Sequence, residues 1–338
     1  MQRPLKPLAE QVVVVLGGSS GIGRRTANRL ARRGASVLVA SRGGPTLDAV
    51  VREIRAAGGT AEAAVCDVRH PEQVVAVAER AVARFGRIDS WVNVAAVSMF
   101  ASVEDTTPDE FRRVIEVNYL GQVHGALAAL PHLKASGGAL IVLSSVESRV
   151  ALPLHGAYAA SKHALEGFTE ALRRELLAEG APVSVTSIKP ASVNTPIFAH
   201  SRNRMEVEPK GPPQIYHPDV VADCVLYAAE HRVRDLYAGG AGRIMVLAQS
   251  LAPALVDAAT ARFAIALEKT RTPAGDGAGT FDAPSTDGRG EGDLGWQARR
   301  TSLYTALQTS GRARAAAGAS LLGGLALLLM RRGRAGRA

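Results

Sequence analysis

Apolar positions along the chain follow two alternating patterns up to about residue 250. Short apolar runs rich in β-branched residues, such as the four valines at 12–15, predict buried strands, whereas apolar residues three and four apart predict amphipathic helices. Strands are expected near 11–16, 35–40, 61–66, 89–94, 138–144, 183–188 and 242–248. Helices are expected near 21–33, 45–57, 71–85, 108–133, 156–180 and 217–230. This alternation predicts an α/β fold, in which one doubly wound parallel sheet carries helices on both faces.

A glycine-rich turn follows the first predicted strand and opens the first predicted helix, with the spacing Gly-x3-Gly-x-Gly. Glycines let the backbone turn tightly and approach a pyrophosphate, and the N–H groups at the start of a helix attract its charge. Any flexible loop also contains glycines, but the position between strand and helix favours dinucleotide binding. The expected contacts are Gly17, Ser19, Ser20, Gly21, Ile22 and Gly23.

The end of the second predicted strand indicates which dinucleotide binds. Ser41 and Arg42 stand there, where a carboxylate would grip the ribose hydroxyls of NAD. A guanidinium can instead pair with the 2′-phosphate of NADP, and the serine can add a hydrogen bond. We therefore expect NADP(H) rather than NAD(H), with a solvated loop arginine as the alternative reading of Arg42.

A second motif indicates proton transfer. Tyr158 and Lys162 lie four residues apart in a predicted helix, and Ser145 lies thirteen residues before the tyrosine, at the end of a predicted strand. Residues at i and i+4 share one helical face, so the ammonium is expected beside the phenol, where it would lower the phenol pKa from its usual value near ~10. Ser145 would hydrogen-bond a substrate oxygen while Tyr158 transfers a proton. A Tyr-x3-Lys pair also occurs by chance, so this interpretation depends on the rest of the chain.

Together these motifs resemble the classical short-chain dehydrogenase/reductase family over about residues 8 to 250. The resemblance implies a single Rossmann-fold catalytic domain in which cofactor and substrate meet at the carboxyl ends of the strands. It makes Tyr158 the general acid/base, Lys162 its partner and a holder of the nicotinamide ribose, and Ser145 the group that orients the carbonyl or alcohol. Asn118 would support a water-linked proton path to the lysine.

The resemblance also implies cofactor contacts outside the glycine turn. Asp67 would contact the adenine amino group, Asn93 would steady the central strand, and Thr195 would reach the nicotinamide carboxamide. The full set of further contacts is Asp67, Val68, Asn93, Ala95, Tyr158, Lys162, Pro190, Val193 and Thr195. The chain departs from the family pattern at Leu16, Val94, Ala96 and Ala191, so we expect an altered pocket shape or weaker cofactor affinity but intact chemistry. Loss of the family threonine at Leu16 removes one expected hydrogen bond between the glycine turn and the fourth strand.

The domain organisation is predicted from shifts in composition. We expect a catalytic domain at 1–250, a helical extension at 251–270, a flexible linker at 271–295 rich in Gly, Asp, Pro, Ser and Thr, and a basic tail at 296–338. An insertion at 196–217 is expected to close over the substrate. Candidate pocket residues are Met99, Phe100, Glu147, His155, Phe198, His200 and Met205.

The tail carries most of the formal net charge of +9, with eight arginines and no acidic residue. Between Arg314 and Arg331 lies the uncharged segment 315–330, which as a helix would span about 24 Å, against a hydrocarbon core of about 30 Å. We expect it to anchor the protein to a membrane through flanking arginines. The alternative is a helix packed on the protein or on a partner subunit.

Other classes of site and partner are disfavoured. Cys66 and Cys224 have no metal or disulfide spacing and are expected to be buried free thiols, and no histidine cluster predicts a metal. Nucleic-acid binding is not expected, because residues outside the tail are nearly neutral. Residues 1–10 contain prolines and charges but no apolar segment, so we expect a cytoplasmic catalytic domain, possibly held at the inner face of a membrane. The resemblance implies a homodimer or homotetramer built on the helices near 108–133 and 156–180.

The sequence therefore predicts an NADP(H)-dependent oxidoreductase that interconverts a carbonyl and an alcohol by hydride transfer. Steroid, fatty, sugar and xenobiotic carbonyls all remain open as substrates. A cofactor-binding, membrane-associated scaffold or sensor with vestigial catalysis is the alternative, suggested by the altered glycine positions and the appended tail.

Overall fold

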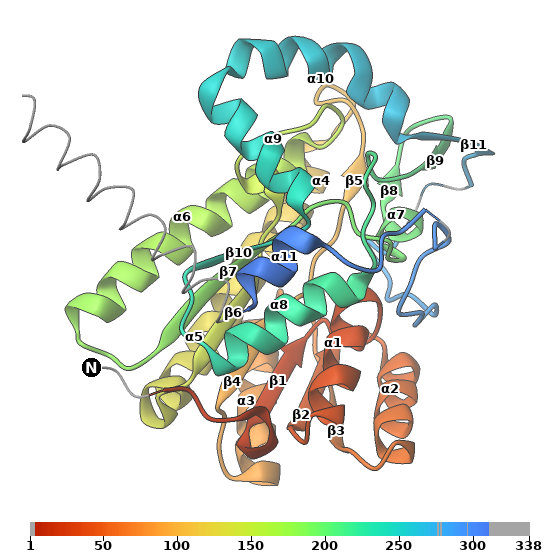
Figure 1. Ribbon diagram of the computed structural model, residues 1–338. Coiled ribbons are helices and arrows are strands. Elements are labelled where there is room, and N and C mark those ends of the chain that lie inside the picture. Colours follow the sequence, from red (N-terminus) through yellow and green to blue (C-terminus); the bar gives the residue numbers. More distant parts are fainter. Residues whose placement is uncertain (1–3, 276, 278, 296, 311–338) are drawn as a thin grey trace, which may run out of the picture.

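The computed structural model describes residues 4–275, 277, 279–295 and 297–310. Its centre is a seven-stranded, wholly parallel sheet in the order β10-β7-β6-β4-β1-β2-β3 (Figure 1). The strands are β1 Val12–Leu16, β2 Ser36–Ser41, β3 Thr60–Val65, β4 Ser90–Asn93, β6 Ala139–Leu143, β7 Ser184–Pro190 and β10 Asp235–Ala238. The predicted doubly wound α/β fold is confirmed.

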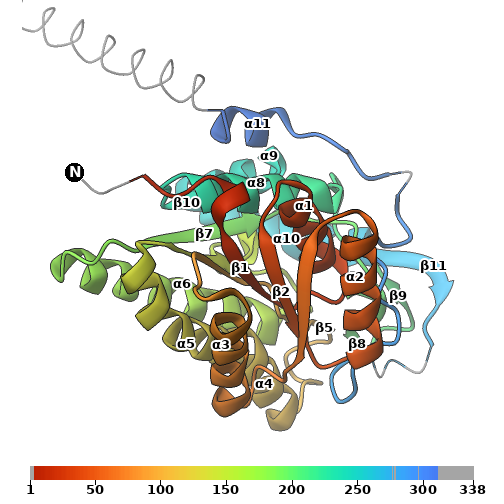
Figure 2. The same ribbon diagram turned by 90° about the horizontal axis from the view of Figure 1, so that it is seen from below.

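Helices cover both faces of this sheet (Figure 2). One layer contains α1 (Gly21–Arg32), α2 (Gly44–Ala56) and α8 (Pro218–Glu230). The other contains α3 (Pro71–Phe85), α4 (Pro108–Ile115), α5 (Gly121–Ser136) and α6 (Gly156–Ala178). A π-helical turn at Glu116–Leu120 joins α4 to α5.

The valine runs of the sequence form the middle of the core. All five residues of β1 are buried. Because successive strand side chains point to opposite faces, Val13 and Val15 join the core under α1 and α8, while Val14 and Leu16 join the core under α3 and α5. Burial on both faces explains why the strand is a continuous apolar run rather than an alternating one.

One predicted strand is a helix in the structure. Residues 242–248 were expected to form the last strand of the sheet, but they lie in α9 (Gly240–Leu251), and the edge strand is the shorter β10 just before it. The turn between them depends on Gly239, whose φ is +106°. A short apolar run does not distinguish a strand from a buried helix by its pattern, and here tertiary contacts decide.

The carboxyl ends of the strands are covered by small elements from the second half of the chain. Strand β5 (Met99–Phe100) pairs with β8 (Arg202–Asn203), close to the short helix α7 (Ile197–His200). Strand β9 (Val207–Pro209) pairs with β11 (Lys269–Pro273), which follows α10 (Pro253–Glu268). The last described helix is α11, Leu303–Gln308.

The flexibility expected for the segment 271–295 stays a prediction, but its described residues include several that contact the catalytic domain. Residues 269–273 form β11, and residues 280–292 lie against the catalytic domain with defined hydrogen bonds. The segment contributes few apolar side chains, and its own backbone groups bind backbone and side-chain groups of the domain. The composition indicates the low apolar content of the segment, but it does not predict these hydrogen bonds of the backbone.

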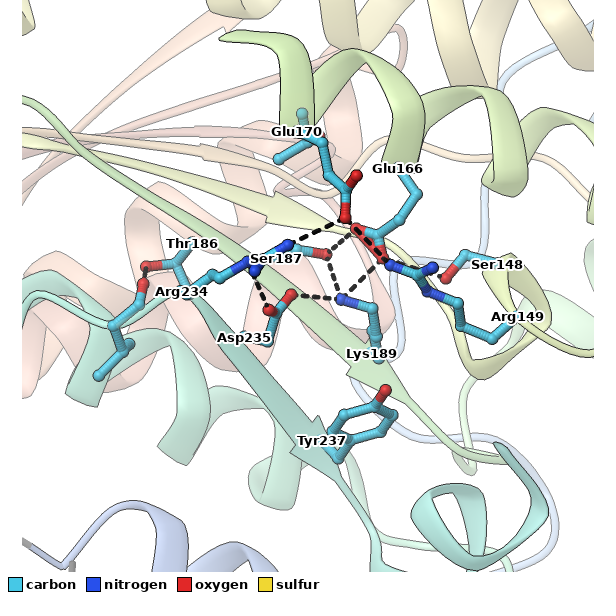
Figure 3. A network of polar contacts seen from close by, with 12 residues as sticks. Ser148, Arg149, Glu166, Glu170, Thr186, Ser187, Lys189, Arg234, Asp235 and Tyr237 are labelled. Atoms are coloured by element: carbon cyan, nitrogen blue, oxygen red, sulfur yellow. Dashed lines mark hydrogen bonds and ion pairs between the residues drawn. The ribbon is translucent and has the colours of Figure 1, made fainter. Parts of the chain in front are cut away.

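A buried polar network ties α6 to the β7–β10 edge of the sheet (Figure 3). Lys189 of β7, with a side chain only 1% exposed, forms ion pairs with Glu166 of α6 at 2.7 Å and with Asp235 of β10 at 2.6 Å. Ser187 and Ser148 donate to Glu166 at 2.6 and 3.3 Å. The network therefore fixes the helix that carries Tyr158 and Lys162 to the sheet.

Substituting Lys189 by Met is expected to lower the free energy of unfolding by about 3–5 kcal/mol, because Glu166 then lacks its closest cation inside the protein. Urea denaturation measures this change. Arg174→Met is the control, since Arg174 is 75% exposed in its ion pair with Glu170 and should contribute about 1 kcal/mol or less. Equal small losses in both variants would contradict the structural role of the network.

The predictions made for the apolar segment and for most arginines of the tail concern residues that the structure does not describe. The apolar segment 315–330 and its proposed membrane anchoring lie outside the described part, and so do six of the eight tail arginines. Within the described residues, no helix is both long and apolar enough to cross a bilayer.

Candidate active site

The proposed catalytic residues lie where β6 ends and α6 begins. Ser145 follows β6, and Tyr158 and Lys162 lie in the first two turns of α6. The ammonium of Lys162 lies 5.5 Å from the Tyr158 ring centroid and donates to the carbonyl oxygen of Leu143 at 2.9 Å. A hydrogen bond joins the hydroxyls of Ser145 and Tyr158. The structure thus brings together the three residues that the spacing predicts.

Burial decides the protonation of this group. It raises the pKa of Tyr158 above its usual range; the Glu147 carboxylate adds to the rise, and the hydrogen bond with Ser145 opposes it. Burial also lowers the pKa of Lys162 to about 8, although Glu147 and Glu166 act to raise it. The predicted lowering of the phenol pKa by Lys162 is therefore not what the described residues produce. Tyr158 holds its proton at neutral pH, as a proton donor must.

Asn118 lies in the π-helical turn between α4 and α5 and is fully buried. Its side-chain oxygen accepts from the N–H of Val97 at 2.8 Å, and its nitrogen donates to the Val97 carbonyl at 2.9 Å and to Ser161 Oγ at 3.2 Å. Such turns recur at functional sites. The Asn118 side chain therefore joins the loop after β4, at Val97, to Ser161, the residue before Lys162. Its part in proton transfer stays a prediction.

The glycine turn after β1 builds one wall of a narrow cleft. Gly17 has φ +87°, and a Cβ there would lie 2.6 Å from the backbone nitrogen of Ala95. A Cβ on Gly23 would collide with the carbonyl oxygen of Gly17, so this glycine permits close packing rather than direct contact. The expected contacts that line the cleft are Gly17, Ser19, Ser20, Gly21, Ile22, Ser41, Arg42, Asp67, Val68, Ala95 and Thr195.

Leu16 stands where the family has a threonine, yet backbone hydrogen bonds still join the glycine turn to the segment after β4. The carbonyl oxygen of Leu16 accepts from the N–H groups of Val94 and Ala95 at 2.9 and 3.0 Å. The backbone thus joins β1 to the segment after β4.

At the far end of the cleft, Arg42 and Asp67 already have protein partners. Arg42 donates to the carbonyl oxygen of Thr280 at 2.7 Å. Asp67 accepts two-pronged hydrogen bonds from Arg69, the shorter at 2.7 Å. Burial acts to raise the pKa of Asp67, but the bonds from Arg69 outweigh it and hold this pKa below its usual value.

Asn93 lies behind the cleft rather than in it. It is 2% exposed, accepts from Trp91 Nε1 at 2.9 Å and donates to the carbonyl oxygen of Gln122 at 3.0 Å. This arrangement agrees with a residue that steadies the central strand and differs from a direct cofactor contact.

A second cavity of about 220 Å³ opens beside Tyr158 and shares Ile22 and Thr195 with the cleft. Among the residues that line this cavity are Ser145, Tyr158, Lys162, Pro190 and Val193, so the proposed catalytic residues face a space that adjoins the cleft. Its remaining walls are mainly apolar and include Phe100, Val146, Leu152, Phe198, Pro212, Pro213 and Met245. The insertion 196–217 contributes to this cavity as expected, but Met99 is buried and does not line it.

Besides Lys162, the charged groups that line the cavity beside Tyr158 are Glu147 and His155. His155 is 4% exposed; its Nδ1 lies 3.0 Å from the Glu147 carboxylate, and its Nε2 lies 3.6 Å from Glu268 of α10. Burial acts to lower the pKa of His155, but the two carboxylates raise it to about 10. The imidazole is therefore a cation at neutral pH.

This histidine should make stability depend on pH. Between pH 6.5 and about 10 the folded protein keeps a proton that the unfolded chain releases, so the stabilisation is complete below 6.5 and is lost as the pH rises toward 10. The difference in free energy of unfolding between the wild type and His155→Gln is expected to shrink over this interval. Urea denaturation at a series of pH values measures it, and a constant difference would contradict the ion-pair arrangement.

The sequence did not predict the contribution of the C-terminal segment to the cleft. Thr280, Pro284 and Ser285 line it, alongside His200 of α7. Their only sequence signal is a Gly, Pro and Ser content that is typical of linkers.

Cys66 and Cys224 are buried free thiols, as predicted. Burial raises the pKa of Cys66 to about 12 and that of Cys224 still further, so both are unreactive as nucleophiles. Within the described residues, no group of three His, Cys, Asp or Glu side chains could hold a metal ion.

Comparison with known proteins identifies the family. A family model described as short chain dehydrogenase matches residues 11–206. The chain belongs to this family. It is 40% identical over 256 residues to the uncharacterised oxidoreductase YxnA of Bacillus subtilis, covering 75% of this chain and 72% of that protein. As a short-chain dehydrogenase, the protein is an NAD(P)-dependent oxidoreductase.

Two solved structures of the short-chain dehydrogenase fold resemble it closely enough to compare. An alcohol dehydrogenase from the archaeon Thermococcus sibiricus, complexed with 5-hydroxy-NADP, is 28% identical, with a TM-score of 0.58 over 67% of this chain and 95% of its own. A single-residue variant of the actinorhodin polyketide ketoreductase with NADPH is also 28% identical, with a TM-score of 0.61 over 68% of this chain and 96% of its own. The resemblance predicted from the motifs is confirmed.

Proposed function

We propose that this protein is an NADP(H)-dependent oxidoreductase that interconverts an apolar carbonyl compound and its alcohol. The observation that carries the proposal is that Ser145, Tyr158 and Lys162 line the apolar cavity, which shares Ile22 and Thr195 with the glycine-turn cleft. A substrate held in the cavity and a dinucleotide held in the cleft would meet at the phenol.

The residues of the cleft fit a phosphorylated dinucleotide. Gly17 leaves a cradle that a side chain would fill, and Gly21, which also lines the cleft, opens α1. Among the described residues Ser41 Oγ is buried without a hydrogen-bond partner, and Arg42 lines the same cleft. An anionic oxygen at this point would satisfy both groups, which supports NADP over NAD.

The chain's own residues supply binding and proton transfer. Tyr158 would donate its proton to the substrate oxygen in the reducing direction, and Ser145 would donate a hydrogen bond to the same oxygen, where negative charge develops. Lys162 is held by the Leu143 carbonyl close to the ring and would support the phenolate that forms. A bound nicotinamide would supply or accept the hydride.

The substrate is proposed to be largely apolar. Most of the cavity wall consists of aliphatic, aromatic and proline side chains. Its polar groups are the proposed catalytic residues, the Glu147–His155 ion pair and a few uncharged side chains such as Ser192 and Gln214. A sugar would leave many of its hydroxyls without partners on such walls, and unpaired buried polar groups are unfavourable.

A panel of carbonyl compounds, followed by the absorbance of NADPH, tests the proposal. Apolar ketones and aldehydes should oxidise NADPH, and polyhydroxy carbonyls should not. Binding of NADPH without oxidation by any member would instead favour the sensor with vestigial catalysis.

The proposed preference for NADPH over NADH is tested by substituting Arg42. Arg42→Ala should raise the Kd for NADPH by about 10- to 100-fold, since a hydrogen bond to a charged group contributes about 1.5–3 kcal/mol, and should leave the Kd for NADH nearly unchanged. Fluorescence titration measures both constants. Arg52→Ala, which removes an exposed arginine outside the cleft, is the control. An equal loss for both dinucleotides would contradict recognition of the 2′-phosphate.

We also propose a homodimer or homotetramer that uses α5 and α6. Leu127 of α5 is 59% exposed and Leu177 of α6 is 63% exposed, and burial of these side chains would favour association. Light scattering of the purified protein measures the mass, and a monomer would contradict this part of the proposal.

A further inference from the structure

The C-terminal segment of residues 280–292, here named the strap, runs beside α7 (Figure 1, blue). Thr280, Pro284 and Ser285 line the cleft. The strap lies outside the part of the chain that the family model matches, which ends at residue 206. It therefore adds a wall that the family match does not account for.

Backbone carbonyl oxygens of the strap bind the donors that dinucleotide phosphates would use. The N–H of Gly21, at the start of α1, donates to the carbonyl oxygen of Arg289 at 2.9 Å. The guanidinium of Arg42 donates to the carbonyl oxygen of Thr280 at 2.7 Å. Carbonyl oxygens carry a partial negative charge and phosphate oxygens carry a larger one, so both are acceptors for the same donors. The strap and the cofactor phosphates would therefore compete for the Gly21 N–H and the Arg42 guanidinium.

The strap is held by one buried side chain and by polar contacts along its length. The carbonyl oxygens of Gly288 and Gly292 accept from Arg24 and Asn194 at 2.7 and 3.2 Å, and Glu291 lies 2.8 Å from His217 Nε2. Of its residues, all of which the structure describes, only Phe281 is buried, at 2% exposure. Asp282 pairs with Arg202 at 2.9 Å, although its side chain is 70% exposed, and Ser285 lies 3.0 Å from His200 Nε2. Because only one of its side chains is buried, the strap should open at a lower free energy than the core elements, whose side chains are mostly buried.

We infer that the strap is a movable cover of the dinucleotide site, which must release Gly21 and Arg42 before the phosphates of the cofactor can bind. The inference rests on the proposed dinucleotide-dependent function. The closed strap and the bound dinucleotide then exclude each other at these donors. The apparent affinity for the cofactor is therefore set partly by how often the strap is open.

A disulfide that holds the strap closed tests this. A Cβ built on Gly43 lies 3.6 Å from the Cβ of Pro284, within the ~3.5–4.5 Å that disulfides require. The same Cβ lies 2.7 Å from Thr46 Oγ1, so every variant carries Thr46→Ala to make room. The test protein is the full chain with Gly43→Cys and Pro284→Cys, and the controls are the two single-cysteine variants.

The Kd for NADPH is measured by fluorescence titration before and after reduction with dithiothreitol, with mass spectrometry to confirm the bond. The oxidised protein should bind at least about tenfold more weakly, and reduction should restore the Kd of the single-cysteine controls. Equal Kd values for both forms would overturn the strap inference and leave the proposed function intact. Failure of the wild type to bind NADPH would contradict the proposed function itself.

A second variant acts in the opposite direction. Phe281→Ala removes the buried anchor of the strap without changing a residue that lines the cleft. If the strap competes with the cofactor, this variant should bind NADPH about threefold or more tightly, because the open fraction rises. If the strap is a fixed wall of the site, its loosening should weaken binding, and unchanged or weaker binding would overturn the inference.

Discussion

Replacing Tyr158 by Phe is expected to lower kcat by about 10²–10⁴-fold and to leave the Kd for NADPH unchanged. The substitution removes one hydroxyl from the wall of the apolar cavity and keeps the half-buried ring. Because burial holds the pKa of this phenol above its usual value, Tyr158 carries the proton that a reduced carbonyl needs, and phenylalanine cannot supply it. Steady-state kinetics and fluorescence titration measure the two quantities.

Tyr119→Phe is the matched control, since Tyr119 packs against Phe168 and lines neither the cleft nor the cavity. It should change kcat by about threefold or less, as expected for a residue without a role in the chemistry. A Tyr158→Phe enzyme that turns over at the wild-type rate would remove Tyr158 from the mechanism. A matching loss of NADPH binding would point instead to a misplaced cofactor.

Ser145→Ala is expected to lower kcat by about 10²–10³-fold, the usual effect of removing one donor to a developing oxyanion. Ser145 lies at the end of β6, and its hydroxyl hydrogen-bonds the Tyr158 hydroxyl and accepts from the N–H of Glu147 at 3.1 Å. Without it, the substrate oxygen would keep only one of its two donors. Single-turnover oxidation of NADPH measures the chemical step directly.

The neighbouring serine offers the control for this variant. Ser144 is equally buried, but its hydroxyl has no hydrogen-bond partner among the described residues. Ser144→Ala removes an unpaired buried hydroxyl and should leave kcat within about twofold of the wild type and stability unchanged or improved. Equal losses in the two variants would mean that packing at this turn matters rather than the Ser145 donor.

Much of the fold could be predicted because its signals are local. The valines of β1, the glycine turn before α1 and the spacing of Tyr158 and Lys162 are patterns within a few residues, and the structure confirms each element. The prediction for 242–248 was wrong because these apolar residues pack as helix α9 against Val146 and Tyr237. That choice depends on contacts that are distant in sequence.

The site shows a similar division between local and distant effects. Spacing predicted that Lys162 lies near the Tyr158 ring, but it could not predict how deeply both are buried, and burial sets the direction of the Tyr158 pKa. The Glu268 partner of His155 lies in α10, and the carbonyl partner of Arg42 lies in the strap. Each partner is more than a hundred residues away in sequence. No local pattern contains such pairs.

Transfer of deuterium from labelled NADPH to substrate tests the central claim most directly. The wild-type enzyme is incubated with NADPH that carries deuterium in both positions at C4 and with the apolar carbonyl compound it reduces fastest, and the alcohol is analysed by mass spectrometry. Hydride transfer predicts one deuterium on the former carbonyl carbon. An enzyme that binds NADPH yet yields unlabelled alcohol, or none, would contradict the assignment of Ser145, Tyr158 and Lys162 to carbonyl reduction.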